Sequence, residues 1–178
     1  MHSNILQKYV STSIGYSITA VKLESLCRDS RMICQSFRRQ SFFSPTEFFE
    51  SVKYYQGTSS PIDACKKENG WSAAWMHHKG RNKHHYEYWQ DNFDNGGKPI
   101  EMPMKYKKEM LCDYLGAGKA YYGKSFTFEK ELQWWNVKKS KPIAMHPNDK
   151  AFIDKYMNML CKCENDKAVF EQIKKEGK

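Results

Sequence analysis

Histidine is concentrated in one short stretch of this chain. Of its six histidines, four are His77, His78, His84 and His85. Imidazole is the commonest protein ligand of transition metals and the usual proton carrier near neutral pH. The stretch therefore predicts a site for a divalent metal ion, and we take these four residues as candidate metal ligands.

The spacing of the histidines limits how many of them can share one ion. Residues seven apart on an unbroken helix are displaced by about 10.5 Å, whereas two nitrogens on one zinc ion can be only about 4 Å apart. The two pairs can therefore meet only if the chain turns between them, which Gly80 and Asn82 permit. Because neighbours on a helix point about 100° apart, we expect one histidine of each pair at the site and three histidines at most.

A metal site of this kind also needs a carboxylate. Asp113 is the leading candidate, because it lies in the hydrophobic segment Met110–Leu115, where an unpaired acid is costly to bury. Glu87, three residues after His84, is the second candidate and the candidate catalytic acid or base. Three cations among the histidines suit a phosphate-bearing substrate. They are Lys79, Arg81 and Lys83.

An alternative interpretation needs no metal. The same histidines and acids would form a hydrogen-bonded network that fixes helix packing, with Tyr86, Tyr88 and Trp89 in the core, and the three cations would be solvated.

A second motif, Gly118 to Ser125, satisfies the phosphate-loop pattern of Gly, four residues and Gly-Lys-Ser. That loop binds phosphate only between a buried strand and a new helix. Here a helix is expected before it, and Tyr121 and Tyr122 would fill the cradle. We interpret it as a helix end and a connecting loop.

Start and stop signals predict an all-α, single-domain helical bundle over residues 1–178. Ser44-Pro45-Thr46-Glu47 reads as a capping box at the start of one helix, and Gly116 is expected to end another. Residues 1–43 form a divergent segment with little periodicity, although Ile14–Leu26 could be helical. The helices expected after that segment span residues 45–55, 61–69, 71–78, 84–90, 103–115, 148–161 and 166–175, with a turn-rich loop over 91–101. A further helix is expected to begin at Thr127 and to carry Leu132, Trp134 and Trp135.

Composition narrows the class of protein. Forty per cent of the residues are hydrophobic, which favours a globular chain, and no apolar run is long enough for a membrane span. With no signal peptide visible, we expect a cytoplasmic protein with free thiols among its six scattered cysteines. The net charge of +9 favours anionic partners, either a phosphate-bearing small molecule or nucleic acid.

From Ser44 onward the chain resembles an uncharacterised family of bacterial and phage proteins, domain of unknown function 5662. The resemblance is carried by residues 44–49, 54–57, 59–63, 77–89 and 112–118, with Trp134-Trp135 and His146-Pro147.

That resemblance implies a ligand order similar to that of the HD-domain metal-dependent phosphohydrolases. An HD-like protein would use an all-α fold and a metal held by histidines and aspartates to activate water against a phosphate ester. The family's His-Asp pair is missing here, because Phe37 to Phe43 contain neither residue type. Either this copy is inactive, or its first 43 residues have changed relative to the family.

Two functions follow as expectations. The first is a metal-dependent phosphohydrolase acting on a nucleotide or related phosphate, active or degenerate. The second is a basic module that binds nucleic acid or protein without catalysis, using aromatic side chains such as Tyr54, Tyr55, Tyr121 and Tyr122 to stack on bases. The substrate, the metal and the oligomeric state do not follow from the sequence.

Overall fold

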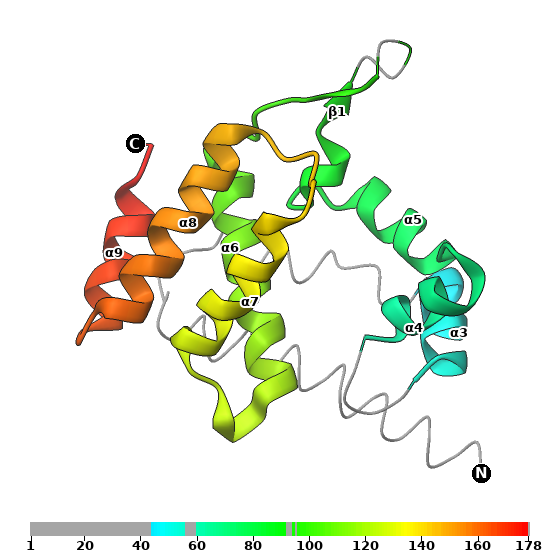
Figure 1. Cartoon of the computed structure of the whole chain (residues 1–178), viewed down its shortest axis with the longest axis horizontal. Helices are drawn as coiled ribbons and strands as arrows, with labels where there is room; N and C mark the ends of the chain where they lie inside the picture. Colours follow the sequence, from blue (N-terminus) through cyan, green and yellow to red (C-terminus); the bar gives the residue numbers. More distant parts are fainter. Residues whose placement is uncertain (1–43, 56–59, 92–93, 95, 178) are drawn as a thin grey trace.

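The structure is a computed structural model that describes residues 44–55, 60–91, 94 and 96–177 (Figure 1). It is all-α, as the sequence predicts. Its helices are α3 (Pro45–Lys53), α4 (Pro61–Asn69), α5 (Ala73–Arg81), α6 (Met104–Tyr122), α7 (Phe128–Ser140), α8 (Pro147–Lys162) and α9 (Asp166–Lys175). The expectations for residues 1–43, including the helix over 14–26 and the missing His-Asp pair, lie outside the described residues.

Short elements connect these helices. The 3₁₀ turns are η1 (Tyr86–Tyr88) and η3 (Gly123–Ser125). The strands β1 (Gln90–Asp91) and β2 (Lys98–Pro99) pair antiparallel within the expected turn-rich region. Among the helices between Pro45 and Lys175, none combines the length and the apolar character needed to cross a membrane.

The helices form two groups (Figure 1). Helices α3, α4 and α5 pack together on one side, whereas α6, α7, α8 and α9 gather on the other. The turn η1 follows α5 and leads to the small hairpin. The chain that carries the four clustered histidines therefore runs along the junction between the groups.

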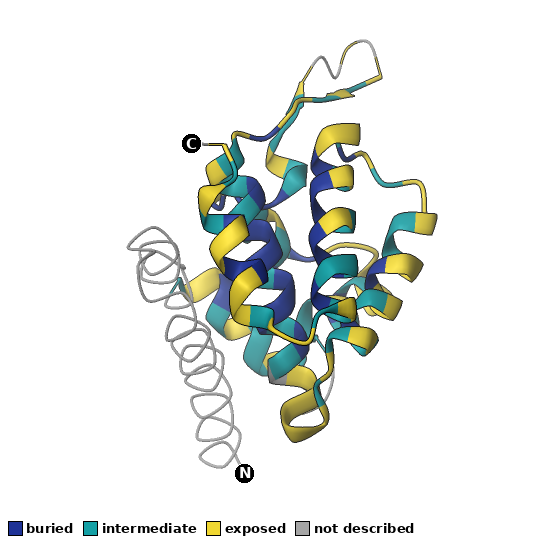
Figure 2. Ribbon diagram, turned by 90° about the vertical axis from the view of Figure 1, so that its left-hand side faces the viewer, coloured by how far each residue is buried: buried dark blue, intermediate teal, exposed yellow. Residues whose placement is uncertain are grey.

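The hydrophobic core belongs to the second group. Trp135, Tyr156 and Phe170 are its largest fully buried side chains, and they come from α7, α8 and α9. Figure 2 shows the buried residues along the faces that these helices turn toward one another. In the group α3–α5 the buried set is instead small or polar. It consists of Glu47, Cys65, Ser72 and Ala74.

Several helix ends follow the predicted chemistry. The Ser60 hydroxyl accepts a hydrogen bond from the Asp63 amide, and Gly70 closes α4 with a φ of 79°. Thr127 likewise accepts from the Lys130 amide at the start of α7. These contacts satisfy backbone groups that a helix end leaves unpaired.

The predicted capping box at Ser44 is wrong. Pro45 does begin α3, but the Ser44 side chain makes no capping hydrogen bond. The Glu47 carboxylate, which the box would turn back to the Ser44 amide, reaches α5 instead.

The expected end of α6 at Gly116 is also wrong, because the helix continues to Tyr122. Gly118 lies inside it, where the Glu131 carboxylate of α7 occupies the space that a Cβ would need. The connecting loop predicted from Gly118 onward is therefore wrong as far as Tyr122, because this part of the phosphate-loop pattern is helical.

An ionic cluster around the buried Asp149 and Lys107 joins the chain before α6 to the start of α8. Asp149 is fully buried and accepts hydrogen bonds from the Met102 amide at 3.1 and 3.2 Å. The Lys107 ammonium lies 3.1 Å from Asp149 and 2.5 Å from Glu101, which also accepts from the Asn148 amide group. Every charge in this cluster has a partner, so the cluster is structural.

Candidate metal centre

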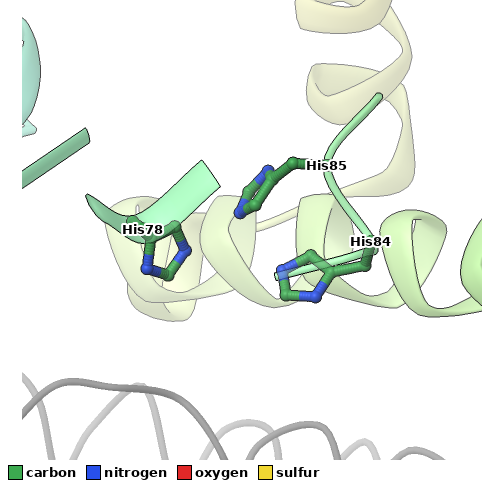
Figure 3. Close-up of side chains that lie close together, drawn as sticks. All are labelled: His78, His84 and His85. Atoms are coloured by element: carbon green, nitrogen blue, oxygen red, sulfur yellow. The ribbon is translucent and has the colours of Figure 1, made fainter. Parts of the chain in front are cut away.

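Three of the four clustered histidines converge. His78, His84 and His85 each place one ring nitrogen within 4.8 Å of those of the other two. The ring centroids of His84 and His85 are 4.3 Å apart, and those of His78 and His85 are 4.8 Å apart. Figure 3 shows His78 on its helix facing the two rings that come from the following segment.

The chain geometry after α5 explains this convergence. Helix α5 ends at Arg81, and Asn82 is extended, with its side-chain amide donating to the His78 carbonyl oxygen at 2.8 Å. The His85 amide then donates to the Asn82 carbonyl oxygen, which closes a turn. This reversal carries His84 and His85 back over the last turn of α5.

Two details of the sequence prediction are wrong here. Helix α5 runs through Gly80 to Arg81 rather than ending at His78, and only η1 forms where a helix over residues 84–90 was expected. Asn82 therefore closes α5 and does not cap a following helix. Because His84 and His85 lie outside a helix, both face the cluster, although only one of the adjacent pair was expected to do so.

His77 does not belong to the cluster. Its Nδ1 lies 2.6 Å from Oε1 of Glu47, on the α3 side of α5. The adjacent His78 also contacts this carboxylate, with its Nδ1 3.2 Å from Oε2.

Two of the converging rings, those of His84 and His85, are buried and have a ring nitrogen without a hydrogen-bond partner among the described residues. His84 is 3% exposed and His85 8% exposed. Among the described residues, neither Nε2 atom has a hydrogen-bond partner. A buried polar atom without a partner costs free energy, so a site that retains two of them is suited to a ligand.

Burial favours the neutral form of the His84 and His85 rings. Burial lowers the pKa of His84, although the nearby Asp113 carboxylate opposes that shift. Burial, the two neighbouring histidines and Lys138 lower the pKa of His85 well below its usual value. A neutral imidazole has a free lone pair, which is the form that binds a metal.

The donor set fits a transition metal. Three imidazoles suit zinc, copper, iron or nickel, and a three-histidine site leaves further positions for water or substrate. Two nitrogens bound tetrahedrally to one zinc ion lie about 3.4 Å apart, so the three ring nitrogens, which lie within 4.8 Å of one another, would have to approach by up to about 1.5 Å to share one ion. The residues present therefore fit a metal ion.

Acidic side chains lie beside the cluster without joining it. Asp113 is half-buried on α6 and acts electrostatically on His84, but it is not among the residues whose ligand atoms fall within 4.8 Å of one another. The Glu87 carboxylate has a buried Oε2 without a hydrogen-bond partner among the described residues. The Glu87 charge also acts on Lys66 and Lys138, where it opposes the lowering of their pKa values by burial.

Lys138 and Lys66 are two functional candidates that the sequence analysis missed. The Lys138 ammonium lies 5.1 to 5.4 Å from the ring centroids of Tyr86, Tyr114 and Trp134. Burial lowers its pKa, and the carboxylates of Glu87 and Asp113 oppose that shift. The one available signal was the spacing of four residues between Trp134 and Lys138 on a helix.

Lys66 occupies a similar setting on α4. Its ammonium is 4.4 Å from the ring centroid of Trp75, and burial lowers its pKa against the opposing charges of Asp63 and Glu87. Trp75 in turn packs its ring 5.0 Å from that of His85.

The predicted phosphate-binding residues are placed less favourably. Arg81 and Lys83 are exposed, and the Lys83 ammonium lies 5.7 Å from the ring centroid of Tyr88. Lys79 is half-buried and close enough to lower the pKa of Lys66.

Comparison with known proteins places this chain in a family. Residues 30–159 match the model of a family of unknown function (DUF5662), and this range includes all three converging histidines. The chain belongs to DUF5662. A search of curated proteins and a search of solved structures each gave no match.

The DUF5662 match extends from before α3 into α8. It therefore covers Glu47, the histidine cluster, the two acids beside it, Lys66 and Lys138. The core helix α9 follows the matched range, so the candidate site lies wholly inside the region that defines the family.

Proposed function

We propose that this DUF5662 protein binds a divalent transition-metal ion through His78, His84 and His85 and hydrolyses a phosphate ester. The observation that carries the proposal is the convergence of three imidazoles, two of them buried with unpartnered Nε2 atoms. A metal ion bound there would supply Lewis acidity, which polarises a phosphoryl group and lowers the pKa of water.

The surrounding side chains fit roles in such a reaction. The unpartnered Oε2 of Glu87 can accept a proton from water as a general base. Lys66 and Lys138 are half-buried and both interact electrostatically with Glu87, and their charge suits the oxygens of a bound phosphate. Lys79 lies beside Lys66 and adds to that charge.

The position of Asp113 supports a second acidic role. Its carboxylate favours the protonated form of His84, so it would also favour a cation at the same place. The ligand order of histidines followed by this aspartate is the part of the HD-like resemblance that the described residues retain. We infer that the site works with an incomplete HD-type ligand set.

The direct test is the metal content of the purified protein. Elemental analysis should give close to one zinc, iron, manganese, nickel or cobalt ion per chain, and His85→Ala should lose it. His146→Asn is a matched control, because His146 lies at the start of α8 outside the cluster and asparagine can also cap a helix. Hydrolysis of a panel of phosphate mono- and diesters by the metal-loaded protein should fall with Glu87→Gln. Failure of every metal to bind would end the proposal.

A second candidate function has one specific observation in its favour. Tyr121 and Tyr122 are 46% and 38% exposed beside the exposed Lys124 at the turn between α6 and α7. Aromatic faces with nearby cations can bind single-stranded nucleic acid. Tyr54 contributes less than expected, because its hydroxyl donates to Glu68 and accepts from the Asn69 amide group.

Salt dependence separates the two candidates. A nucleic-acid module should bind an oligothymidine with an affinity that falls steeply as salt rises, and Tyr121→Ala should weaken that binding. Metal binding without oligonucleotide affinity would favour the hydrolase.

A further inference from the structure

We propose that Glu47 of α3 is a positioning residue for the metal centre. Its carboxylate holds the imidazole of His78 so that the nitrogen opposite the hydrogen bond is presented to His84 and His85. The inference rests on the proposed metal-binding function and adds a residue from a separate helix to the site.

The contact is short, buried and two-sided. Oε1 of Glu47 lies 2.6 Å from Nδ1 of His77, and Oε2 lies 3.2 Å from Nδ1 of His78. The Glu47 side chain is 7% exposed, and those of His77 and His78 are 21% and 13% exposed. Helices α3 and α5 pack against each other along this contact.

Hydrogen-bond chemistry assigns the proton. An ionised carboxylate only accepts hydrogen bonds, so its 3.2 Å contact with Nδ1 of His78 is a hydrogen bond when Nδ1 carries the ring proton. The Asn82 amide group also lies 3.2 Å from this Nδ1, but one of its two N–H groups donates to the His78 carbonyl oxygen at 2.8 Å, and we assign the Nδ1 proton to the hydrogen bond with the carboxylate. Nε2 of His78 is then the nitrogen that carries the lone pair.

This arrangement is the usual support for a metal-bound histidine. A carboxylate that accepts from the far nitrogen fixes the tautomer and the ring orientation and makes the ligand nitrogen more basic. Of the three converging histidines, His78 is the one whose ring lies within hydrogen-bond distance of a carboxylate in the part of the chain that the structure describes. Glu47 is thus placed to act on the metal through His78 without touching it.

The same geometry gives His77 a role. His77 and His78 are adjacent on α5, and each binds one oxygen of the same carboxylate. Because the shorter contact is the one to His77, this residue anchors Glu47 and so fixes the second oxygen against His78. The pair of adjacent histidines therefore supplies one ligand and one anchor.

Glu47→Gln tests the proposal, and Glu50→Gln is its matched control. Glu50 lies one turn later on α3, and its carboxylate accepts from the Ser72 hydroxyl and the Ala73 amide at the start of α5. Both variants remove one negative charge from the α3–α5 contact, but only Glu47 touches a candidate ligand. Zinc affinity is measured by competition with a chromophoric chelator, and the visible absorption of the cobalt-loaded protein reports the ligand geometry.

Glu47→Gln should weaken zinc binding 10- to 100-fold and change the cobalt spectrum, because an amide cannot accept from both rings. Glu50→Gln should leave both readouts unchanged. Equal zinc affinity and equal spectra for wild type and Glu47→Gln would overturn the proposal. If the wild type itself binds no zinc or cobalt, the proposed function fails, and that result is distinct from a loss confined to Glu47→Gln.

A measurement on the wild type avoids dependence on a variant that could fail to fold. Long-range ¹H–¹⁵N correlation spectra of the metal-free protein should show His78 protonated at Nδ1 and unprotonated at Nε2. Protonation at Nε2 would overturn the proposal.

Discussion

Two polar clusters in this protein, each with buried members, differ in how fully their polar atoms are hydrogen-bonded. In the cluster of Lys107, Asp149 and Glu101, each charged group has a partner, and the Asp149 carboxylate is bound to both a backbone amide and an ammonium group. In the histidine cluster, the Nε2 atoms of His84 and His85 have no partner among the described residues. A satisfied network stabilises a fold, whereas buried atoms without partners cost free energy unless a ligand binds them.

The largest loss of stability is expected from a substitution in the ionic cluster. Lys107→Met leaves the buried Asp149 carboxylate without its cation, so the free energy of unfolding should fall by about 3–5 kcal/mol. Urea denaturation of the metal-free protein measures this loss. The folded fraction should keep the zinc affinity of the wild type, and a loss of both properties together would show that the two clusters are not independent.

A bound metal ion should stabilise the folded protein by coordinating the ring nitrogens that lack hydrogen-bond partners. Zinc at 100 times its dissociation constant should raise the free energy of unfolding of the wild type by about 2.7 kcal/mol. His85→Ala should remove this stabilisation, whereas Lys107→Met should keep it. Thermal unfolding with and without zinc gives the measurement, and equal stabilisation of wild type and His85→Ala would place the metal elsewhere.

Glu131, on α7, also has a buried oxygen, Oε2, without a hydrogen-bond partner among the described residues, and this should reduce the stability of the fold. Burial raises the pKa of this carboxyl group from 4.5 to about 7. The folded state therefore holds the proton more tightly than the unfolded state, and the associated stability is lost as pH rises through that range. Glu131→Gln should be more stable than wild type by up to about 3 kcal/mol at pH 8, and this gain should shrink toward pH 4.5. A gain that does not depend on pH would contradict the assignment.

The smallest expected effect is the response of the metal-free cluster to acid. Because the pKa values of His84 and His85 are lowered in the folded protein, the unfolded chain binds more protons as pH falls below 6.5. Stability should therefore fall with acidification, by up to about 1.4 kcal/mol per pH unit for each histidine. His85→Gln should flatten this slope between pH 7 and 5.5 in the presence of a chelator. An unchanged slope would mean that His85 is protonated in the fold.

The sequence predicts most of the helices because their signals are local. Ser60, Gly70 and Thr127 act at the helix ends as their residue types indicate. Gly116 misleads because a glycine inside a helix costs only about 1 kcal/mol, and burial of the neighbouring α6 residues outweighs that cost. At position 118 glycine fits inside the helix because the Glu131 carboxylate occupies the space that a Cβ atom would need.

The sequence predicts that the histidines form a site, but it does not predict which of them converge and which one contacts Glu47. Spacing indicates that a turn is needed after His78, and the structure has that turn. Spacing carries no information about α3, so Glu47 looked like part of a capping box. Its contact with His77 joins residues 30 positions apart, and only the packing of α3 on α5 determines it.

The three converging histidines all lie between positions 78 and 85 of the chain. Closing so short a loop costs little chain entropy, and none of the long-range contacts of α6–α9 is needed to bring the rings together. An ion could therefore organise this segment locally during folding, before the large apolar side chains assemble. Conversely, removal of a bound ion by a chelator should loosen the segment from His78 to His85 while leaving the Trp135–Tyr156–Phe170 core intact.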